Sequence, residues 1–403
     1  MSLIAEMPKP PAPLHPMPRQ PFRRRRTPLT LDIVRTQEDF LALNTWWDAL
    51  VDQCEMRSPF LRWDYMCLWW SECRENDARL AVGVLRDAEG VPLAIAPLML
   101  TSVRDAGRRC LRHLSFLAGL GHAHGERLDF IVPAGEEGEL TPRLCRVFDL
   151  LRDECDTVRL NHLPEESPNT PHIRAALEEH FDRACVLNRH ASRFIRLPAS
   201  WEAYEKRHTS DWRSKLRRRC KAFIHEHAGS VALGGVDLTI QQSLDELHRL
   251  HLMQWPEGVS SFLTEVSWRF HQRLARRWMP DQHAVMPMLA SDGRVVAAMY
   301  GFIERGEFFQ YQMGWDQDFS RLSIGRLVIR WCIDYTIQRG LVVHDMLPGD
   351  YQYKKQWCES SRWLLDLEAH NPRSWKARAF HALRAARRML PRGPNPPHDP
   401  IQS

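Results

Sequence analysis

The chain has 403 residues, of which 44% are hydrophobic and 26% charged, so it is long enough for two domains and has the balance of a soluble globular protein. Its longest apolar run, residues 93–100, contains Pro97 and is far shorter than the roughly 20 residues of a membrane-spanning helix. The first residues contain charge and proline but no apolar stretch, which argues against a secretory signal. We therefore expect a cytoplasmic protein.

The positive charge lies at the two ends of the chain. The formal net charge is +5, yet residues 1–30 carry +5 and residues 372–403 carry +6, which leaves the body at −6. The basic balance is therefore no evidence for a nucleic-acid-binding fold, and we expect no specific nucleic-acid partner.

Residues 1–30 contain eight prolines and four consecutive arginines, Arg23 to Arg26, with almost no periodic apolar pattern. This composition predicts a disordered arm. The arm is either a solvated tail or a contact for a membrane surface or another polyanion, and both interpretations stay open.

The ten cysteines are scattered without a Cys-x-x-Cys pair, and Cys145 and Cys332 sit in apolar runs. Buried free thiols explain them better than disulfides or zinc. His122 and His124 flank Ala123 in a Gly-rich loop, but no further ligand follows at a suitable spacing. We expect loop histidines and no metal.

The pattern becomes globular from Thr36. Apolar periodicity predicts a helix over 38–54 and a Trp-rich helix from Trp63 to Trp70. Strands over 81–86 and 91–101 follow, joined by a turn at 87–90. Thr141-Pro142 is expected to cap and open a helix that reaches Leu151, and a strand is expected over 158–164.

A dense basic helix is expected within residues 201–227. Its cations are Arg213, Lys215, Arg217, Arg218, Arg219 and Lys221. Its single apolar stripe is Trp212, Leu216, Cys220, Phe223 and Ile224. Either the stripe docks the helix and leaves the charge in water, or the cations line the path of an anionic substrate.

Residues 284–357 give the clearest pattern. Three β-rich runs at 284–290, 294–304 and 307–315 are separated by Asp292-Gly293 and Arg305-Gly306, which predicts an antiparallel meander. A helix follows, with Ser323 as N-cap and Gly340 after its end. Its apolar face is Ile324, Leu327, Val328, Trp331, Cys332 and Tyr335. Residues 341–347 then read as a buried strand.

An internal duplication is indicated by two pairs of segments. The hairpin Gly90-Val-Pro-Leu-Ala-Ile-Ala is similar to Gly293-Arg-Val-Val-Ala-Ala-Met, and the run 158–164 is similar to 342–348. We infer two related α/β units with mixed central sheets flanked by helices. The predicted divisions are an arm (1–30), an N-terminal domain (31–195), a C-terminal domain (196–371) and a basic amphipathic tail (372–403).

The tail contains a short helix candidate in which Trp375, Ala379, Leu383, Ala386 and Leu390 face one way. This surface is a partner or membrane contact, or it only covers the domain.

The start of the helix after Ser323 predicts an anion site, because the first backbone N–H groups of a helix are unpaired and the helix dipole favours negative charge. Gly325 would let a phosphate approach the backbone. The predicted anion-binding residues are Arg321, Ser323, Ile324, Gly325 and Arg326. In the first unit the corresponding helix start carries Glu136, Glu137 and Glu139, which would repel a pyrophosphate.

The strand order, Ser323-Ile324-Gly325, the strand 341–347 and Gly349-Asp350-x-x-Tyr353-Lys354 resemble the GNAT acyltransferase superfamily over roughly residues 31–370. The branch that they resemble most is the CelD-like acetyltransferases of bacterial cellulose synthesis. Arg321 stands for the first residue of the commoner phosphate-binding pattern, whose first glycine is missing here. The resemblance implies tandem GNAT-like domains and acetyl-CoA as the acyl donor in the second one.

The resemblance also implies that an amine or hydroxyl attacks the thioester directly, so the protein must accept one proton and supply another. Asp345 and Glu257 are the candidate bases, and Glu257 falls on the acceptor side. Tyr353 is the candidate acid, with Tyr351 as its competitor. Lys354 binds a phosphate or an acceptor carboxylate, or is a surface lysine. Asp345 is otherwise a buried carboxylate that bonds a backbone N–H or Lys354.

The predicted function is an acetyl-CoA-dependent N- or O-acyltransferase that acts on a small-molecule or saccharide acceptor in exopolysaccharide production. Two other hypotheses stay open. A Fem-type transferase has the same tandem fold with an aminoacyl-tRNA donor, although the body is net acidic and the long helical hairpin expected of many Fem enzymes is not visible. A non-catalytic interaction factor would act through its basic ends.

Overall fold

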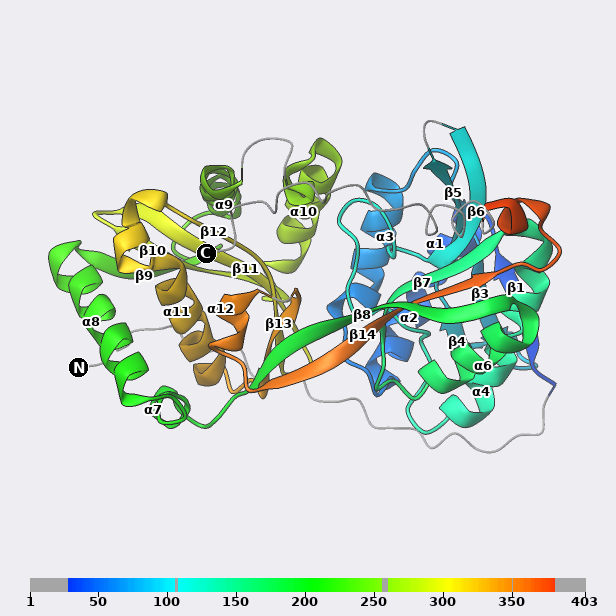
Figure 1. Cartoon of the computed structure of the whole chain (residues 1–403), viewed down its shortest axis with the longest axis horizontal. Helices are drawn as coiled ribbons and strands as arrows, with labels where there is room; N and C mark the ends of the chain where they lie inside the picture. Colours follow the sequence, from blue (N-terminus) through cyan, green and yellow to red (C-terminus); the bar gives the residue numbers. More distant parts are fainter. Residues whose placement is uncertain (1–27, 106–107, 256–259, 350, 381–403) are drawn as a thin grey trace, which may run out of the picture. The chain divides into compact units, whose positions relative to one another are not determined.

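The computed structural model describes residues 28–105, 108–255, 260–349 and 351–380 (Figure 1). The chain forms two compact units. The C-terminal unit contains Ser192–Ser361 and Asp87–Gly90, and the N-terminal unit contains Leu31–Arg86, Val91–Ala191 and the described residues from Arg362 on. None of the helices in the described ranges has the length and apolarity needed to cross a membrane.

The C-terminal boundary of the second unit differs from the sequence-based division at residue 371. Strand β14 (Ser360–His370) pairs antiparallel with β7 (Thr157–Pro164), from Leu364↔Pro164 to His370↔Thr157. This pairing places most of the last strand in the N-terminal unit. A pairing over 200 residues of chain leaves no local signal in the sequence.

The N-terminal unit has a three-stranded sheet in the order β1-β3-β4 and a larger sheet in the order β2-β5-β6-β7-β14-β8. Its further strands are β1 (Thr30–Val34), β2 (Arg79–Leu80), β3 (Val82–Arg86), β4 (Pro92–Ala96), β5 (Leu98–Asp105), β6 (Arg108–Phe116) and β8 (Asp182–Arg196), the last of which runs on into the C-terminal unit. Its helices are α1 (Gln37–Ala42), α2 (Asn44–Gln53), α3 (Trp63–Glu72), α4 (Glu137–Leu144), α5 (Val147–Leu151) and α6 (Thr170–His180).

Three boundaries in this unit differ from the sequence-based expectation. The helix expected over 38–54 is α1 and α2, which meet at Leu43. The strand expected over 91–101 is β4 and β5, which join different sheets on either side of Pro97, a residue without a backbone donor. The helix expected to open at Thr141-Pro142 begins at Glu137, and the buried Thr141 hydroxyl donates to Asn169 Oδ1 at 2.6 Å.

The C-terminal unit has a sheet in the order β8-β13-β12-β11-β10-β9. Its strands include β9 (Gly229–Gly234), β10 (Ala284–Ser291), β11 (Arg294–Glu304), β12 (Glu307–Trp315) and β13 (Val343–Pro348). Its α-helices are α7 (Trp201–Glu205), α8 (Ser210–Glu226), α9 (Ile240–Gln254), α10 (Glu265–Trp278), α11 (Ile324–Gln338) and α12 (Gln352–Lys355). The predicted meander is confirmed as β10, β11 and β12, with antiparallel pairing throughout.

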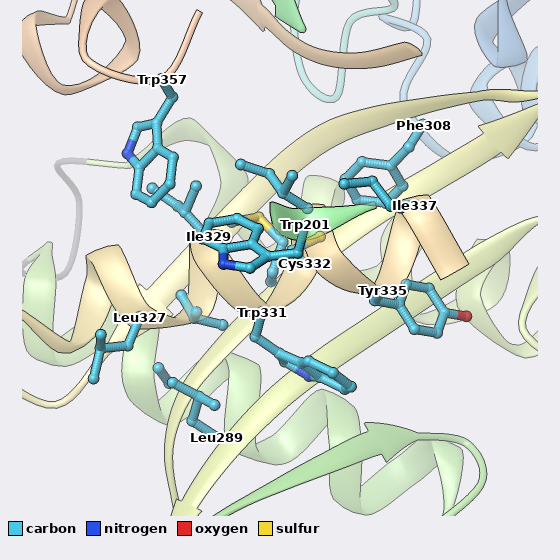
Figure 2. Close-up of a cluster of buried hydrophobic side chains, with 14 of the residues drawn as sticks. Trp201, Leu289, Phe308, Leu327, Ile329, Trp331, Cys332, Tyr335, Ile337 and Trp357 are labelled. Carbon is cyan, nitrogen blue, oxygen red and sulfur yellow. The ribbon is translucent and has the colours of Figure 1, made fainter. Parts of the chain in front are cut away.

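Helix α11 forms the centre of the hydrophobic core of this unit. The predicted apolar face from Ile324 to Tyr335 is buried, and Gly340 follows the helix end with a φ of 69°. Figure 2 shows Leu327, Ile329, Trp331 and Cys332 of α11 within a buried cluster that includes Trp201 and Trp357. The cluster also contains Ile329, Ile333 and Ile337, which lie outside the predicted face, so α11 is buried more completely than a one-faced surface helix.

Helices α9 and α11 lie on opposite faces of β12. A Cβ built on Gly314 would lie 2.8 Å from the backbone nitrogen of His251 in α9, whereas one built on Gly325 of α11 would lie 3.2 Å from Cδ1 of Trp315. Successive strand residues such as Gly314 and Trp315 point to opposite faces of a sheet. The unit is therefore a three-layer α/β structure around β12.

The basic helix is α8. Leu216 and Phe223 of its predicted stripe are buried, and Trp212, Cys220 and Ile224 are partly buried. Arg217 and Arg218 are exposed, and Arg217 pairs with Glu205 of α7 at 2.5 Å. The stripe therefore docks the helix and leaves much of its charge in water, as the first of the two interpretations expects.

Candidate functional site

Strands β12 and β13 separate part-way along their length. They pair in parallel from Glu307↔Val343 to Phe309↔Asp345, and β12 then continues to Trp315 while still paired with β11 on its other side. Within the described residues, no strand covers the β13-facing edge of β12 beyond Phe309. Free backbone groups on such an edge can pair with an extended ligand.

The start of α11 leaves backbone donors available. The Ser323 carbonyl accepts from Arg326 N at 2.8 Å, but among the described residues the N–H groups of Ile324 and Gly325 have no hydrogen-bond partner. The N-cap position of Ser323 is confirmed, although its side chain makes no capping bond and its backbone is left-handed, with a φ of 53°. The two N–H groups and the helix dipole make this end suited to an anion.

The helix start adjoins the open edge of β12. A Cβ on Gly325 would lie 3.2 Å from Trp315 Cδ1 and 3.3 Å from Trp315 Nε1, so glycine lets the last residue of β12 lie against the first turn of α11. This close approach explains a glycine that would otherwise cost the helix about 1 kcal/mol relative to alanine. Approach of a phosphate to the same glycine remains a prediction.

Two guanidinium groups lie near this helix start. Burial, and then the positive charge of Arg219 from α8, lower the pKa of Arg326. The Arg326 guanidinium also donates to Gln356 Oε1. Like charges held near one another are stabilised by a bound anion. Arg321, the other predicted arginine, is exposed at the end of the 3₁₀ helix Gln317–Leu322.

Asp345 is fully buried where β12 and β13 separate. Its Oδ1 accepts hydrogen bonds from Ser192 Oγ and from the backbone N–H of Leu347, each at 2.7 Å. The second bond holds Leu347 in a left-handed conformation with a φ of 59°. Asp345 therefore fixes the irregular end of β13. This contact agrees with the interpretation of Asp345 as a buried carboxylate that bonds a backbone N–H.

Lys354 lies beside the same strand end. It is buried, and its Nζ donates to the carbonyl oxygens of Leu347 at 2.9 Å and Pro348 at 2.8 Å. The structure thus places it inside the fold rather than on the surface. Its ammonium group satisfies carbonyls that the end of β13 leaves unpaired.

Tyr353 lies one residue before Lys354, in α12. Burial raises the pKa of Tyr353 above its usual range, and the charge of an ionised Tyr351 would raise it further. The two rings are stacked with their centroids 5.9 Å apart, and Tyr351 is half-exposed. A tyrosine with a raised pKa keeps its proton at neutral pH, as a general acid requires.

Glu257 and Asp350 lie outside the described residues. The structure thus brings Asp345, Tyr353 and Lys354 together around the end of β13, and Ser323, Ile324, Gly325 and Arg326 at the start of α11.

Buried polar side chains that the sequence did not single out lie on the α9–α10 side of the sheet. Burial lowers the pKa of His271 to about 3, and its ring centroid lies 4.9 Å from that of Tyr311 and 5.9 Å from that of Tyr300. Among the described residues, neither ring nitrogen of His271 nor the Tyr300 hydroxyl has a hydrogen-bond partner. Tyr311 is the extra residue of a β-bulge in β12, which re-aims its side chain. These groups are available to a polar ligand or water.

The N-terminal unit repeats the strand-helix-strand arrangement with acidic residues at its helix start. β6 and β7 pair in parallel from His113↔Thr157 to Ser115↔Arg159, with α4 and α5 between them in sequence. Glu136 is the N-cap of α4, and Glu137 and Glu139 occupy its first turn. Carboxylates at this position disfavour a phosphate, so no phosphate site is expected at the start of α4.

Residues 210–355 match the family model described as acetyltransferase (GNAT) domain. The chain therefore carries a GNAT-type acyltransferase domain in its C-terminal unit. A search of curated proteins gives no match.

Solved structures are similar to this chain in fold at low sequence identity. FemX is 11% identical over 84% of this chain and 98% of its own, with a TM-score of 0.56. A conserved protein of unknown function from Bacteroides thetaiotaomicron is 12% identical over 84% of this chain and 100% of its own, with a TM-score of 0.52. The C-terminal domain of a putative lysylphosphatidylglycerol synthetase from Agrobacterium fabrum is 11% identical, covering 86% of this chain and 96% of its own, with a TM-score of 0.50. The fold is a tandem GNAT-like α/β fold.

Proposed function

We propose that the C-terminal unit transfers an acyl group, in the first instance acetyl, from coenzyme A to an amine or hydroxyl. The observation that carries the proposal is the separation of β12 and β13 beside the start of α11. The open edge of β12 offers backbone groups to the extended pantetheine arm of the donor. The free N–H groups of Ile324 and Gly325 then face its pyrophosphate, with Arg326 and Arg219 as nearby cations.

The reaction needs no covalent enzyme intermediate in this proposal. The acceptor attacks the thioester carbonyl while its proton passes to Asp345, to Glu257 or to water, and Tyr353 protonates the departing thiolate. Lys354 is a positioning residue in this proposal. Its hydrogen bonds to the Leu347 and Pro348 carbonyls hold the end of β13 next to Tyr353. The α9–α10 side, with His271 and Tyr300, is our candidate for the acceptor pocket.

Gly325→Val tests the placement of the donor. The valine side chain would displace Trp315 and cover the helix start, so we expect the donor Michaelis constant to rise at least about tenfold, while the circular dichroism spectrum is unchanged. Release of coenzyme A from acetyl-CoA, measured with a pool of amine and hydroxyl acceptors, gives the constant.

Gly138→Val is the matched control, because Gly138 lies in the first turn of α4 and a Cβ there meets nothing within 4 Å. A Gly325→Val protein with the parent's donor constant would place the donor elsewhere.

A second candidate function is aminoacyl transfer from tRNA. Its support is the fold similarity to FemX and to a putative lysylphosphatidylglycerol synthetase domain, together with the exposed cations of α8. In this case tRNA should bind with an affinity that falls steeply with salt, and Arg217→Gln with Arg218→Gln should reduce that slope. Weak, salt-insensitive tRNA binding would leave acyl-CoA as the donor.

The acceptor and the cellular role come into the proposal only from the CelD-like resemblance. We propose a saccharide amine or hydroxyl of exopolysaccharide production, and the acceptor pool should be separated to identify which compound gains the acetyl group. Deleting residues 1–30 and 381–403 tests the non-catalytic hypothesis, because a catalyst keeps its turnover without these basic ends and an adaptor that acts through them does not.

A further inference from the structure

A compact group of possible metal ligands lies in the N-terminal unit. His124 and Glu126 come from the loop that follows β6, and His162 comes from β7. One ligand atom from each of the three residues lies within 4.8 Å of those from the other two. His124 Nε2 is 3.6 Å from Glu126 Oε1, and His162 Nδ1 is hydrogen-bonded to Glu126 Oε2.

We propose that His124, Glu126 and His162 bind a divalent d-block cation such as zinc. Two imidazoles with one carboxylate are a ligand set that zinc accepts, and imidazole disfavours magnesium and calcium, which prefer oxygen. Three protein ligands leave a fourth position for water or a substrate oxygen. An ion held at about 2.0–2.2 Å needs ligand atoms roughly 3.4 Å apart, so the hydrogen-bonded His162 Nδ1 and Glu126 Oε2 must move apart to admit it.

The loop that carries two of the ligands is held in place by its backbone. The Tyr65 hydroxyl donates to the Ala123 carbonyl at 2.9 Å, and the Trp69 indole N–H donates to the His122 carbonyl at 2.8 Å. Gly125 N donates to Ala118 O at 2.8 Å, and Ser58 Oγ to Glu126 O at 3.3 Å. A loop fixed in this way holds ligands in advance of the ion.

The third ligand is fixed by a second layer of contacts. His162 has a left-handed φ of 59°, which is uncommon for residues other than glycine, and its backbone N–H donates to Asp366 Oδ1 at 3.1 Å. Asp366 Oδ2 accepts from His190 Nε2 at 2.8 Å, and the His190 ring stacks on that of His162 with an interplanar angle of 9°. Strained backbone of this kind clusters at functional sites.

Access from solvent also suits a cation. The side chains of Glu126 and His162 are 14% and 15% exposed, whereas that of His124 is 41% exposed, which leaves an entry path from solvent.

Calorimetric titration of the metal-free full chain with zinc chloride tests the site, with magnesium chloride as the comparison. We expect one zinc ion per chain, a higher melting temperature with zinc, and no binding of magnesium at the same concentration. Glu126→Gln and His162→Asn should each weaken zinc binding at least about tenfold. Asparagine is chosen at 162 because it tolerates a left-handed backbone. His122→Asn, a neighbour outside the ligand set, should bind zinc like the parent.

The cobalt-substituted native chain provides a check that needs no variant. X-ray absorption should show nitrogen and oxygen neighbours only, because the proposed ligands contain no sulfur. Sulfur in the shell would instead assign the ion to a thiol such as the exposed Cys185 and would overturn the site. Absence of zinc binding to the native chain, or equal binding by Glu126→Gln and His162→Asn, would also overturn it and leave a hydrogen-bonded His-Glu-His group.

Discussion

Replacement of Tyr353 by phenylalanine is expected to lower kcat by roughly 10²- to 10⁴-fold, the usual contribution of a general acid. The change removes one hydroxyl and almost no volume from a ring that packs against the core of the C-terminal unit. Burial raises the pKa of Tyr353, so the parent enzyme should show no loss of this proton below about pH 10, the usual pKa of tyrosine. Donor affinity should be unchanged, since the ring and its stacking remain.

Tyr351→Phe is the matched control for this prediction. Tyr351 is the stacked, half-exposed neighbour of Tyr353, and its loss of a hydroxyl should leave kcat near that of the parent. The Tyr353→Phe defect should disappear with an activated thioester, whose thiolate leaves without a proton. Full turnover of Tyr353→Phe on acetyl-CoA would transfer the acid role to Tyr351 or to water.

Asp345→Asn should lower kcat by roughly 10²- to 10⁴-fold if Asp345 is the general base, while the melting temperature changes by only a few degrees. The two hydrogen bonds from Ser192 and Leu347 both end on Oδ1, so an amide oxygen can still accept both. The substitution therefore removes the charge and the basic oxygen without removing these contacts. Activity and thermal unfolding should be measured on the same preparation.

Ser192→Ala separates a chemical role from a positioning role for Asp345. It removes the hydroxyl that donates to Oδ1 but leaves the carboxylate. A loss of kcat as large as that of Asp345→Asn would mean that Asp345 acts by holding the end of β13. A large loss of both activity and melting temperature in Asp345→Asn would place it among the structural residues.

The sequence predicted the C-terminal unit well because its signals are local. Turn residues Asp292-Gly293 and Arg305-Gly306, the apolar period of α11 and Gly340 each depend on neighbours within one element, and all were confirmed. The tandem arrangement was inferred from local similarity within two pairs of segments. In the N-terminal unit, the sequence did not predict the strand break at Pro97 or the start of α4 at Glu137. The break at Pro97 separates strands of two different sheets, which a local pattern does not reveal.

The side-chain arrangement of the site could not be read from the sequence in the same way. The sequence left Lys354 as a ligand of a phosphate or an acceptor carboxylate, or as a surface lysine. Only the structure shows it buried against the carbonyls at the end of β13. His271 and Tyr300 are far apart in sequence and gave no signal, although both are buried polar groups. The sequence offered no further ligand close to His124, because His162 lies 38 residues later in the chain, on β7.

Calorimetric titration of the full chain with acetyl-CoA tests the central claim most directly. We predict one donor molecule per chain with a Kd between about 1 μM and 1 mM, the range of ordinary Michaelis constants, and a weaker Kd for Gly325→Val than for Gly138→Val. No heat of binding at millimolar acetyl-CoA, or equal affinity in both glycine variants, would contradict a donor site at the start of α11.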